Sequence, residues 1–288
     1  MLLSQHPADR FKTRNIRVTL KTGGISLSPC QPPFGFAELL RQRAQPPRQQ
    51  GTAFVATHLG VSGFIRVHWQ GQRYLMMVHQ QRHDRADEVL KLPSGYVDCD
   101  HLGAPWRALE QELCEELLLQ TPEGLLPLLR GNSALPRPYS SQLAYQSDRA
   151  ILKASSEFEG TPILWQGERL GACECYLHRP TGSVQLVFHW DLELPDRLPR
   201  GLTLWQLEER LTPTGKMLET HWEYREPLWL APLNEYDLLD GGLYQLRDDL
   251  LLPAEGGDRL LLSEYFAPRQ GVWVNSDNIR LSNYHPCC

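Results

Sequence analysis

The sequence predicts an α+β fold, because two strand-rich hairpins flank one strongly amphipathic helix. The first hairpin is predicted over residues 64–82, where "QGQ" turns one β-rich run back onto another. The second is predicted over residues 172–194, around the turn "RPTG". The helix is predicted to begin near Pro105, since a proline in the first turn loses no intrahelical hydrogen bond.

The composition is typical of a soluble globular protein. The chain has 288 residues, of which 41% are hydrophobic and 22% charged, and no apolar run approaches the roughly 20 residues that cross a bilayer. The N-terminus lacks the apolar segment of a secretory signal. The seven cysteines are odd in number and form no CxxC pair, so we expect reduced thiols rather than disulfides or zinc ligands. These features favour a cytoplasmic protein with no membrane contact.

One central domain with an extension at each end is the organisation that we expect. Pro and Gly punctuate residues 1–50, which are predicted to form an N-terminal extension with a strand at 16–20 and a short helix at 36–42. The regular domain is predicted over residues 51–240, and a C-terminal extension over 241–288.

Further elements are predicted inside and beyond the central domain. Residues 121–160 are rich in Pro, Ser and Gly, which indicates a long loop with short strands. The segment "TLWQLEERL" (203–211) is predicted to be a short helix, and "EPLWLAPLNEYDLL" (226–239) a strand that runs through Pro232 into a helix. Strand-like runs in the last forty residues are expected to add a strand or to cover an edge.

The first fifty residues are basic although the whole chain is acidic. They carry eight Lys or Arg against two acids, while the net charge of the chain is −5. A basic arm can dock on its own chain, on a second subunit in a homodimer, or on a polyanion such as RNA. The chain does not interleave aromatic with basic residues as many RNA-binding proteins do, so the sequence favours docking on its own chain over nucleic acid.

The predicted helix carries three acids on one face. Trp106, Leu109, Leu113 and Leu117 form an apolar stripe, and Glu112, Glu115 and Glu116 cluster about a quarter turn away. Like charges at this spacing repel by a few tenths of a kcal/mol for each pair. A solvated acidic face is the ordinary explanation of such a pattern, whereas a hard cation such as Mg²⁺ would neutralise the repulsion and bridge to phosphate.

The segment that contains these acids, residues 95–119, resembles the Nudix box, G-x5-E-x7-R-E-U-x-E-E-x-G-U, in which U is a bulky aliphatic residue. "QELCEELLL" aligns with its second half, so that Glu112, Glu115 and Glu116 match, and "LPSGYVD" is similar to the loop that precedes the family's helix. The resemblance covers roughly residues 51–240. It implies an α/β/α sandwich built on a mixed β-sheet.

The sequence departs from the box at several positions. Gln111 stands in place of the arginine that holds the neighbouring glutamates, and Leu118 in place of a glycine. The spacing from Gly95 to Glu112 is longer by two residues, which puts Gly103 at the first glutamate, where Asp98 or Asp100 could substitute.

The resemblance implies a metal-dependent pyrophosphohydrolase acting on a nucleoside diphosphate linked to another group, such as a dinucleotide or a nucleotide sugar. Mg²⁺ or Mn²⁺ would be held by Glu112, Glu115, Glu116 and the carbonyl of Gly95. Glu112, Glu116 or the distant Glu219 would act as the catalytic carboxylates. The altered positions leave open a second hypothesis, a weak or inactive nucleotide-binding or regulatory module on the same fold.

The substrate is only weakly encoded. "LPRPYSSQL" (135–143) is similar in position to a specificity segment of NADH pyrophosphatases, which makes Arg137 and Tyr139 candidates for substrate binding. A Pro-rich loop with one aromatic residue is more often a rigid turn. Trp165 and Trp205 could stack on a base or lie in the core. "CEC" (173–175) is expected to pack both thiols into the core rather than to bind a metal.

Overall fold

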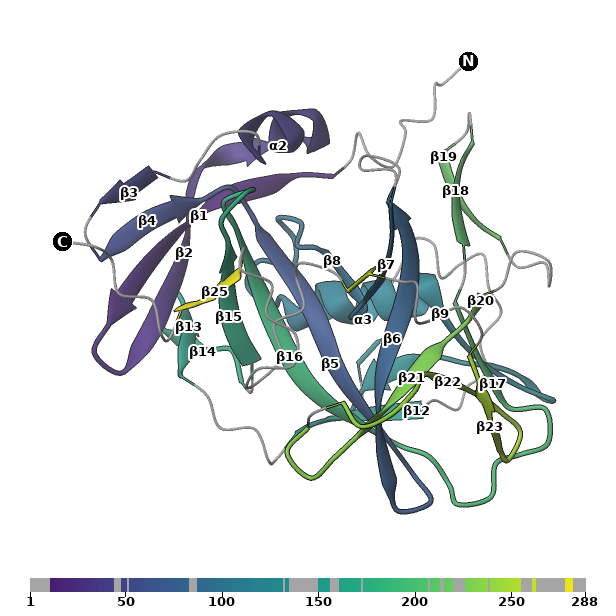
Figure 1. Cartoon of the computed structure of the whole chain (residues 1–288). Helices are drawn as coiled ribbons and strands as arrows, with labels where there is room; N and C mark the ends of the chain where they lie inside the picture. Colours follow the sequence, from purple (N-terminus) through teal and green to yellow (C-terminus); the bar gives the residue numbers. More distant parts are fainter. Residues whose placement is uncertain are drawn as a thin grey trace.

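A computed structural model gives the fold of the chain (Figure 1). The residues that it describes are 11–43, 48–50, 52–82, 87–131, 133–134, 150–155, 161–171, 173–206, 208–212, 215–219, 226–237, 239–254, 261–262 and 278–281.

The described residues form a mostly β protein with two helices and two mixed sheets. The helices are α2 (Phe36–Arg43) and α3 (Trp106–Glu116). None of the described helices is both long and apolar enough to cross a membrane. The predicted mixed sheet and the helices are thus present in a protein that is mostly β, and the α/β/α sandwich stays a prediction.

The smaller sheet joins the N-terminal strands to later parts of the chain. β1 pairs antiparallel with both β2 and β4, while β2 pairs in parallel with β13. In order across the sheet, its strands are β14 (Glu168–Arg169), β13 (Ile163–Trp165), β2 (Gly24–Phe34), β1 (Thr13–Lys21), β4 (Ala53–Ala56) and β3 (Arg48–Gln50).

The larger sheet is organised about two long parallel strands, β5 and β16. β15 and β6 pair antiparallel with β16 and β5 respectively, β25 adds to β15, and β21 adds to β6. These six strands are β25 (Asn278–Arg280), β15 (Cys173–His178), β16 (Ser183–Glu193), β5 (Leu59–Trp69), β6 (Gln72–Arg82) and β21 (Trp229–Leu233).

Shorter strands complete this sheet around α3. β8 pairs with β5, and β9 pairs with β17. They are β7 (Asp87–Lys91), β8 (Ser94–Tyr96), β9 (Leu117–Thr121), β10 (Gly124–Leu126), β11 (Leu128–Arg130), β12 (Ala150–Ala154), β17 (Thr203–Gln206), β20 (Glu226–Pro227), β22 (Tyr244–Arg247), β23 (Leu250–Pro253) and β24 (Leu261–Leu262). A separate hairpin consists of β18 (Glu208–Thr212) and β19 (Gly215–Glu219).

The central strands are buried on both faces. Ile65 and Val67 of β5 belong to the main core, on the side of the sheet that α3 covers (Figure 1), and the leucines of α3 belong to the same core. Phe64 points the other way, into a second cluster with Leu75, Met77 and Trp229. Strands covered on both sides lose the simple alternation of apolar and polar residues.

Buried charges compensate one another on the second face of the sheet. Arg66 of β5 is only 2% exposed, and its guanidinium pairs with Asp191 of β16 at 2.7 Å and with Asp237 at 2.9 Å. His68 adds a 2.9 Å contact to Asp191. A buried guanidinium with two carboxylate partners is tolerated because each removes part of the cost of desolvation.

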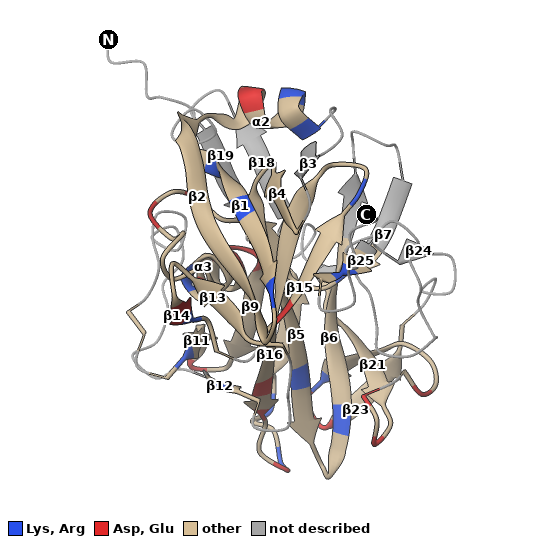
Figure 2. Ribbon diagram, turned by 90° about the vertical axis from the view of Figure 1, so that its left-hand side faces the viewer, with Lys and Arg blue, Asp and Glu red and all other residues tan. Residues whose placement is uncertain are grey.

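Several predicted elements are confirmed. The strand at 16–20 lies within β1, the helix at 36–42 corresponds to α2, and both predicted hairpins are present. Helix α2 has an acidic residue in its first turn and basic residues in its last turn, as the red and blue segments in Figure 2 show. This distribution favours the helix through its dipole.

Two predicted helices are wrong. Within the range 203–211, the described residues form strands β17 and β18. The backbone of β17 pairs along β9, while Leu202 and Leu204 enter the core. After β21 the chain turns instead of forming a helix. The side chain of Asn234 accepts the N–H of Tyr236 at 2.9 Å, and Asp237 adopts a left-handed conformation with φ 59° that a helix cannot contain.

Candidate functional site

Helix α3 presents its apolar stripe to the core as predicted. Leu109 and Leu113 are 0% exposed and Leu117, which follows the helix, is 2% exposed. Trp106 is half-buried, and the guanidinium carbon of Arg130 lies 5.0 Å from the centre of its ring. This packing fixes the rotation of the helix about its axis, and therefore the direction in which its glutamates point.

Glu112 and Gly95 meet at the contact between α3 and β8. A methyl group built on Gly95 would overlap the carboxyl carbon and Cγ of Glu112. Glycine is therefore needed at this point of β8 because the glutamate side chain lies directly against the strand. The two residues belong to separate parts of the motif noted in the sequence, and the structure brings them together.

The Gly95 carbonyl is partly committed to the sheet. Gly63 donates its N–H to the carbonyl of Pro93 at 2.9 Å, and Val97 donates to Leu59 at 3.0 Å. Because hydrogen-bonded pairs alternate along an antiparallel ladder, the intervening Val61–Gly95 pair is also of the hydrogen-bonded kind. One lone pair of the Gly95 carbonyl thus faces Val61, which leaves the second for any other donor or ion.

Gln111 orients Glu115. The amide Nε2 of Gln111 donates a hydrogen bond of 2.7 Å to Oε1 of Glu115. Glu115 is only 4% exposed. In the motif that this segment resembles, an arginine stands at this position. A neutral amide supplies one of the same hydrogen bonds without adding positive charge.

The end of α3 explains the leucine at position 118. Leu117 is already extended, with φ −119° and ψ 138°, and it donates its N–H to the carbonyl of Leu113. The chain passes directly from the helix into β9, so no left-handed residue is required and a glycine has no advantage there. Leu118 is instead 1% exposed and fills the interior.

Glu110 is a buried structural residue of the helix that the sequence did not reveal. Its Oε1 accepts the N–H of Arg130 at 3.0 Å and the hydroxyl of Ser133 at 2.8 Å, and the residue is 2% exposed. It fixes the turn after β11 to the helix. The one available signal was its position four residues after Trp106, on the edge of the apolar stripe.

The loop before α3 is held by Asp98. Its Oδ1 accepts the N–H groups of Asp100 and His101, both at 3.0 Å, and lies 3.2 Å from Nδ1 of His101. Burial alone would raise the pKa of Asp98, but the hydrogen bond and the charge of His101 lower it below its ordinary value. Asp98 thus stabilises a turn. Gly103, at the position of the motif's first glutamate, is exposed.

The donor set suits a hard cation, although it is sparse. Glu112, Glu115 and Glu116 supply carboxylate oxygens, and the missing side chain of Gly95 leaves a recess that Glu112 enters. Within the described ranges, no three His, Cys, Asp or Glu side chains converge to hold a metal. Mg²⁺ commonly takes one or two protein carboxylates and completes its shell with water and substrate phosphate, so the residues fit an ion of that kind.

The other candidates are not brought to this site. Arg137 and Tyr139 lie outside the described residues. Glu219 is the last residue of β19, and its side chain is not described. Trp165 is 6% exposed in the main core, and Trp205 is half-buried in β17.

The predicted packing of Cys173 and Cys175 into the core is confirmed. Cys30, Cys99, Cys114, Cys173 and Cys175 are free thiols. Cys173 and Cys175 both enter the main core, and burial raises the pKa of Cys173 to about 12. Such thiols are poor nucleophiles and poor metal ligands at neutral pH.

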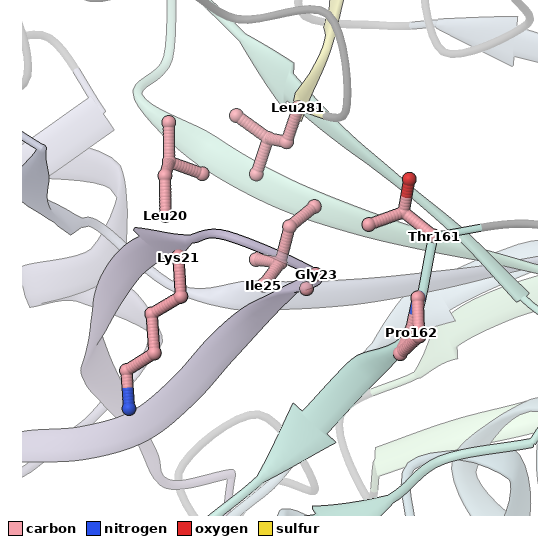
Figure 3. Close-up of a pocket in the computed structure, with 8 residues that line it drawn as sticks. Leu20, Lys21, Gly23, Ile25, Thr161, Pro162 and Leu281 are labelled. Atoms are coloured by element: carbon pink, nitrogen blue, oxygen red, sulfur yellow. The ribbon is translucent and has the colours of Figure 1, made fainter.

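A cavity of about 340 Å³ lies at the tip of the β1–β2 hairpin (Figure 3). Leu20 and Ile25 of the hairpin line it together with Pro162 and Leu281. No residue of the predicted site contributes to its walls.

Comparisons with known proteins add no relationship: no protein-family model, no curated protein and no solved structure matches the chain.

Proposed function

We propose that the protein is a metal-dependent pyrophosphohydrolase of Nudix type, which cleaves a nucleoside diphosphate linked to another group. The contact between Gly95 of β8 and Glu112 of α3 is the observation that supports this proposal most. The absence of a side chain at Gly95 lets the Glu112 carboxylate of α3 lie against β8, next to the Gly95 carbonyl that is the other proposed ligand. The hydrogen bond from Gln111 to Glu115 adds support, since it orients a second carboxylate on the same helix.

In this proposal the chain supplies ligands, a base and a fixed geometry. Glu112, Glu115 and Glu116, with the second lone pair of the Gly95 carbonyl, would hold one or more Mg²⁺ or Mn²⁺ ions. When bound, the metal polarises the pyrophosphate and stabilises negative charge as the bond breaks. Glu112, or Glu116 or Glu219, takes the proton of the attacking water, which adds to phosphorus as one P–O anhydride bond is cleaved. The products are two phosphate-bearing molecules.

A direct assay tests the proposal. The native chain is incubated with Mg²⁺ and a panel of nucleotide sugars and dinucleotides, and product phosphates are quantified. We expect Glu116→Gln to reduce turnover about a hundredfold or more, because one metal-binding carboxylate contributes several kcal/mol to transition-state stabilisation. Glu123→Gln, at an exposed position in the turn between β9 and β10, is the matched control and should retain activity. Equal turnover in the native protein and Glu116→Gln contradicts the proposed site.

A binding module without turnover is the second candidate function. It is favoured by Gln111, Leu118 and Gly103 at positions where the motif has other residues, and by the absence of three converging metal ligands among the described residues. This candidate predicts that a nucleotide raises the melting temperature of the native protein while no product forms over many hours. Product formation that Glu116→Gln abolishes excludes it.

A further inference from the structure

Lys91, the last residue of β7, is a buried cation that no described carboxylate neutralises. The residue is 8% exposed. Its Nζ donates to the carbonyl oxygen of Ser94 at 3.3 Å and to the hydroxyl of Ser94 at 3.2 Å. Across the described ranges, no Asp or Glu lies within ion-pair distance of it.

This arrangement is costly unless an anion is supplied from elsewhere. Moving an ammonium group out of water costs several kcal/mol, and a buried charge is normally paired with an opposite charge. The two acceptors of Ser94 are neutral, and an ammonium has three donors. The other deeply buried cation, Arg66, shows the ordinary solution, since it has two carboxylate partners. Among the described residues, Lys91 has two neutral hydrogen-bond acceptors and no carboxylate counter-ion.

The position of Lys91 links it to the candidate site. Its ammonium contacts Ser94, and the next residue of β8 is Gly95, against which Glu112 lies. Ser94 pairs with Ser62 and Gly95 with Val61, so the two side-chain directions alternate across the strand. The cation and the carboxylate of Glu112 therefore contact consecutive residues from the two sides of β8. Ser94, Gly95 and Tyr96 are all partly exposed, so solvent reaches this strand.

We propose that Lys91 and Ser94 form an anion subsite that binds a phosphate group of the ligand. The ammonium donates to a phosphate oxygen, and the Ser94 hydroxyl, which accepts from Lys91, donates its own hydrogen to a second oxygen. The inference rests on the proposed function and extends it, because it places one phosphate group of the ligand beside Ser94, the residue that precedes Gly95 in β8.

A purely structural role for Lys91 is the competing explanation. The same two hydrogen bonds close the Leu92–Pro93 turn, so their loss alone could loosen the loop. Replacement by arginine and by methionine separates the two roles. Arginine keeps the positive charge and methionine keeps only the apolar stem, while removal of the Ser94 hydroxyl leaves Lys91 and its bond to the backbone in place.

The experiment measures binding of inorganic pyrophosphate to the full chain by calorimetry in EDTA, so that neither metal nor turnover contributes. We expect Lys91→Met to weaken pyrophosphate binding about tenfold or more, and Lys91→Arg to bind within about threefold of the native affinity. Ser94→Ala should weaken binding about threefold, because it removes one hydrogen bond to the charged phosphate. Lys153→Met, which removes an exposed lysine of β12, is the control and should bind as the native protein does. Circular dichroism melts verify that each variant is folded.

The outcomes separate this subsite from the proposed activity. Native affinity in Lys91→Met and Ser94→Ala, or no binding of pyrophosphate to the native chain, overturns the subsite. If Lys91→Met does not fold, unchanged affinity in Ser94→Ala decides against it and reduced affinity decides for it. Pyrophosphate binding that depends on Lys91, without hydrolysis of any nucleotide when Mg²⁺ is added, supports the subsite and rejects the hydrolase. Hydrolysis of a nucleotide by Lys91→Met with the KM of the native protein supports the hydrolase and rejects the subsite.

Discussion

Gly95 and Glu112 show how one residue can be fixed by another that is distant in the sequence. The glycine has no unusual backbone angle that demands it, so its reason is the close approach of the glutamate side chain. That reason is independent of any chemistry at the site. The pair can therefore be tested through the stability of the protein alone.

Gly95→Ala is predicted to lower the free energy of unfolding by about 1–3 kcal/mol, because the added methyl group must displace the Glu112 carboxylate. Glu112→Ala removes the Cγ, Cδ and Oε1 atoms, which are the three atoms nearest to the added methyl group. In the Glu112→Ala background, the cost of Gly95→Ala should therefore fall to a few tenths of a kcal/mol. Urea unfolding of the native protein, the two single variants and the double variant gives the coupling free energy between Gly95 and Glu112.

Gly103→Ala is the matched control for this cycle. It lies in the loop between β8 and α3, and its nearest neighbour, Nε1 of Trp165, is 3.9 Å from the added carbon, an ordinary contact. It should change the free energy of unfolding little in either background. Additive effects of Gly95→Ala and Glu112→Ala would mean that the two residues do not meet.

The sequence could predict which residues of α3 carry charge, but not how each charge is satisfied. The spacing of Glu112, Glu115 and Glu116 indicated a single acidic face. In the structure Glu115 is buried and bonded to Gln111, whereas Glu112 lies against β8. Lys91 gave no signal, since its burial depends on strands that are brought together only by the fold.

At the scale of elements, strand β25 is joined to the sheet through Glu174. Arg280 of β25 contacts Glu174 at 2.5 Å, and the Tyr176 hydroxyl also donates to this carboxylate, which is 5% exposed. His189 lies 3.8 Å away. Burial alone would raise the pKa of Glu174, but His189, Tyr176 and Arg280 lower it to about 2.

This cluster predicts an acid-sensitive attachment of β25. Because the folded pKa lies below the ordinary value of 4.5, Glu174 contributes stability that is complete above about pH 4.5 and is lost as the pH falls towards 2. The contribution is on the order of 3 kcal/mol. Glu174→Gln should unfold more easily at pH 7 and lose less stability than the native protein between pH 5 and pH 3, measured by urea unfolding.

Glu193→Gln and Arg280→Met complete this test. Glu193 is exposed at the end of β16, so its loss should leave the pH dependence unchanged. Arg280→Met should remove part of the effect of Glu174, because two further donors remain. If Glu174→Gln loses as much stability between pH 5 and pH 3 as the native protein does, Glu174 is not the group that causes the acid sensitivity.

Elements were predicted best where local pattern and tertiary pairing agree. In the hairpin β5–β6 and in helix α3 the local sequence pattern and the tertiary contacts favour the same structure, so their positions follow from the sequence. At 203–211 the spacing of leucines favoured a helix, but pairing with β9 supplied the backbone hydrogen bonds of a strand. At 234–237 the short-range bond of Asn234 and the buried Arg66 at Asp237 stabilise a turn. Strand β9 and Arg66 are both distant in the sequence from the segments that they stabilise.

At the scale of the whole molecule, the basic N-terminal segment is part of the core. Ile16, Val18 and Leu27 are 0% exposed and share the main core with Leu59 and Leu113. Thr13 also donates to the carbonyl of Val97 at 3.0 Å, in the loop that leads to α3. The predicted docking of this segment on its own chain therefore has a physical basis in apolar burial as well as in charge.

Removal of residues 1–50 is predicted to prevent folding. Each buried aliphatic side chain of β1 and β2 contributes about 1.5–3 kcal/mol, so their joint loss is comparable to the whole stability of a typical domain, about 5–15 kcal/mol. The positive charge of the segment is expected to contribute little to its folding. Arg17, Lys21 and Arg41 are exposed, and the triple replacement by glutamine should leave the melting temperature within a few degrees of the native value.

The comparison of these two variants decides what the segment does. If the truncated chain is insoluble or melts without a cooperative transition while the triple variant folds normally, the segment acts through its core residues. RNA affinity that falls steeply with salt in the native chain and is lost in the folded triple variant would instead give the charge a role in binding. A truncated chain with a native melting temperature would contradict the burial argument, because the remaining sheet would then be stable without the strands that cover it.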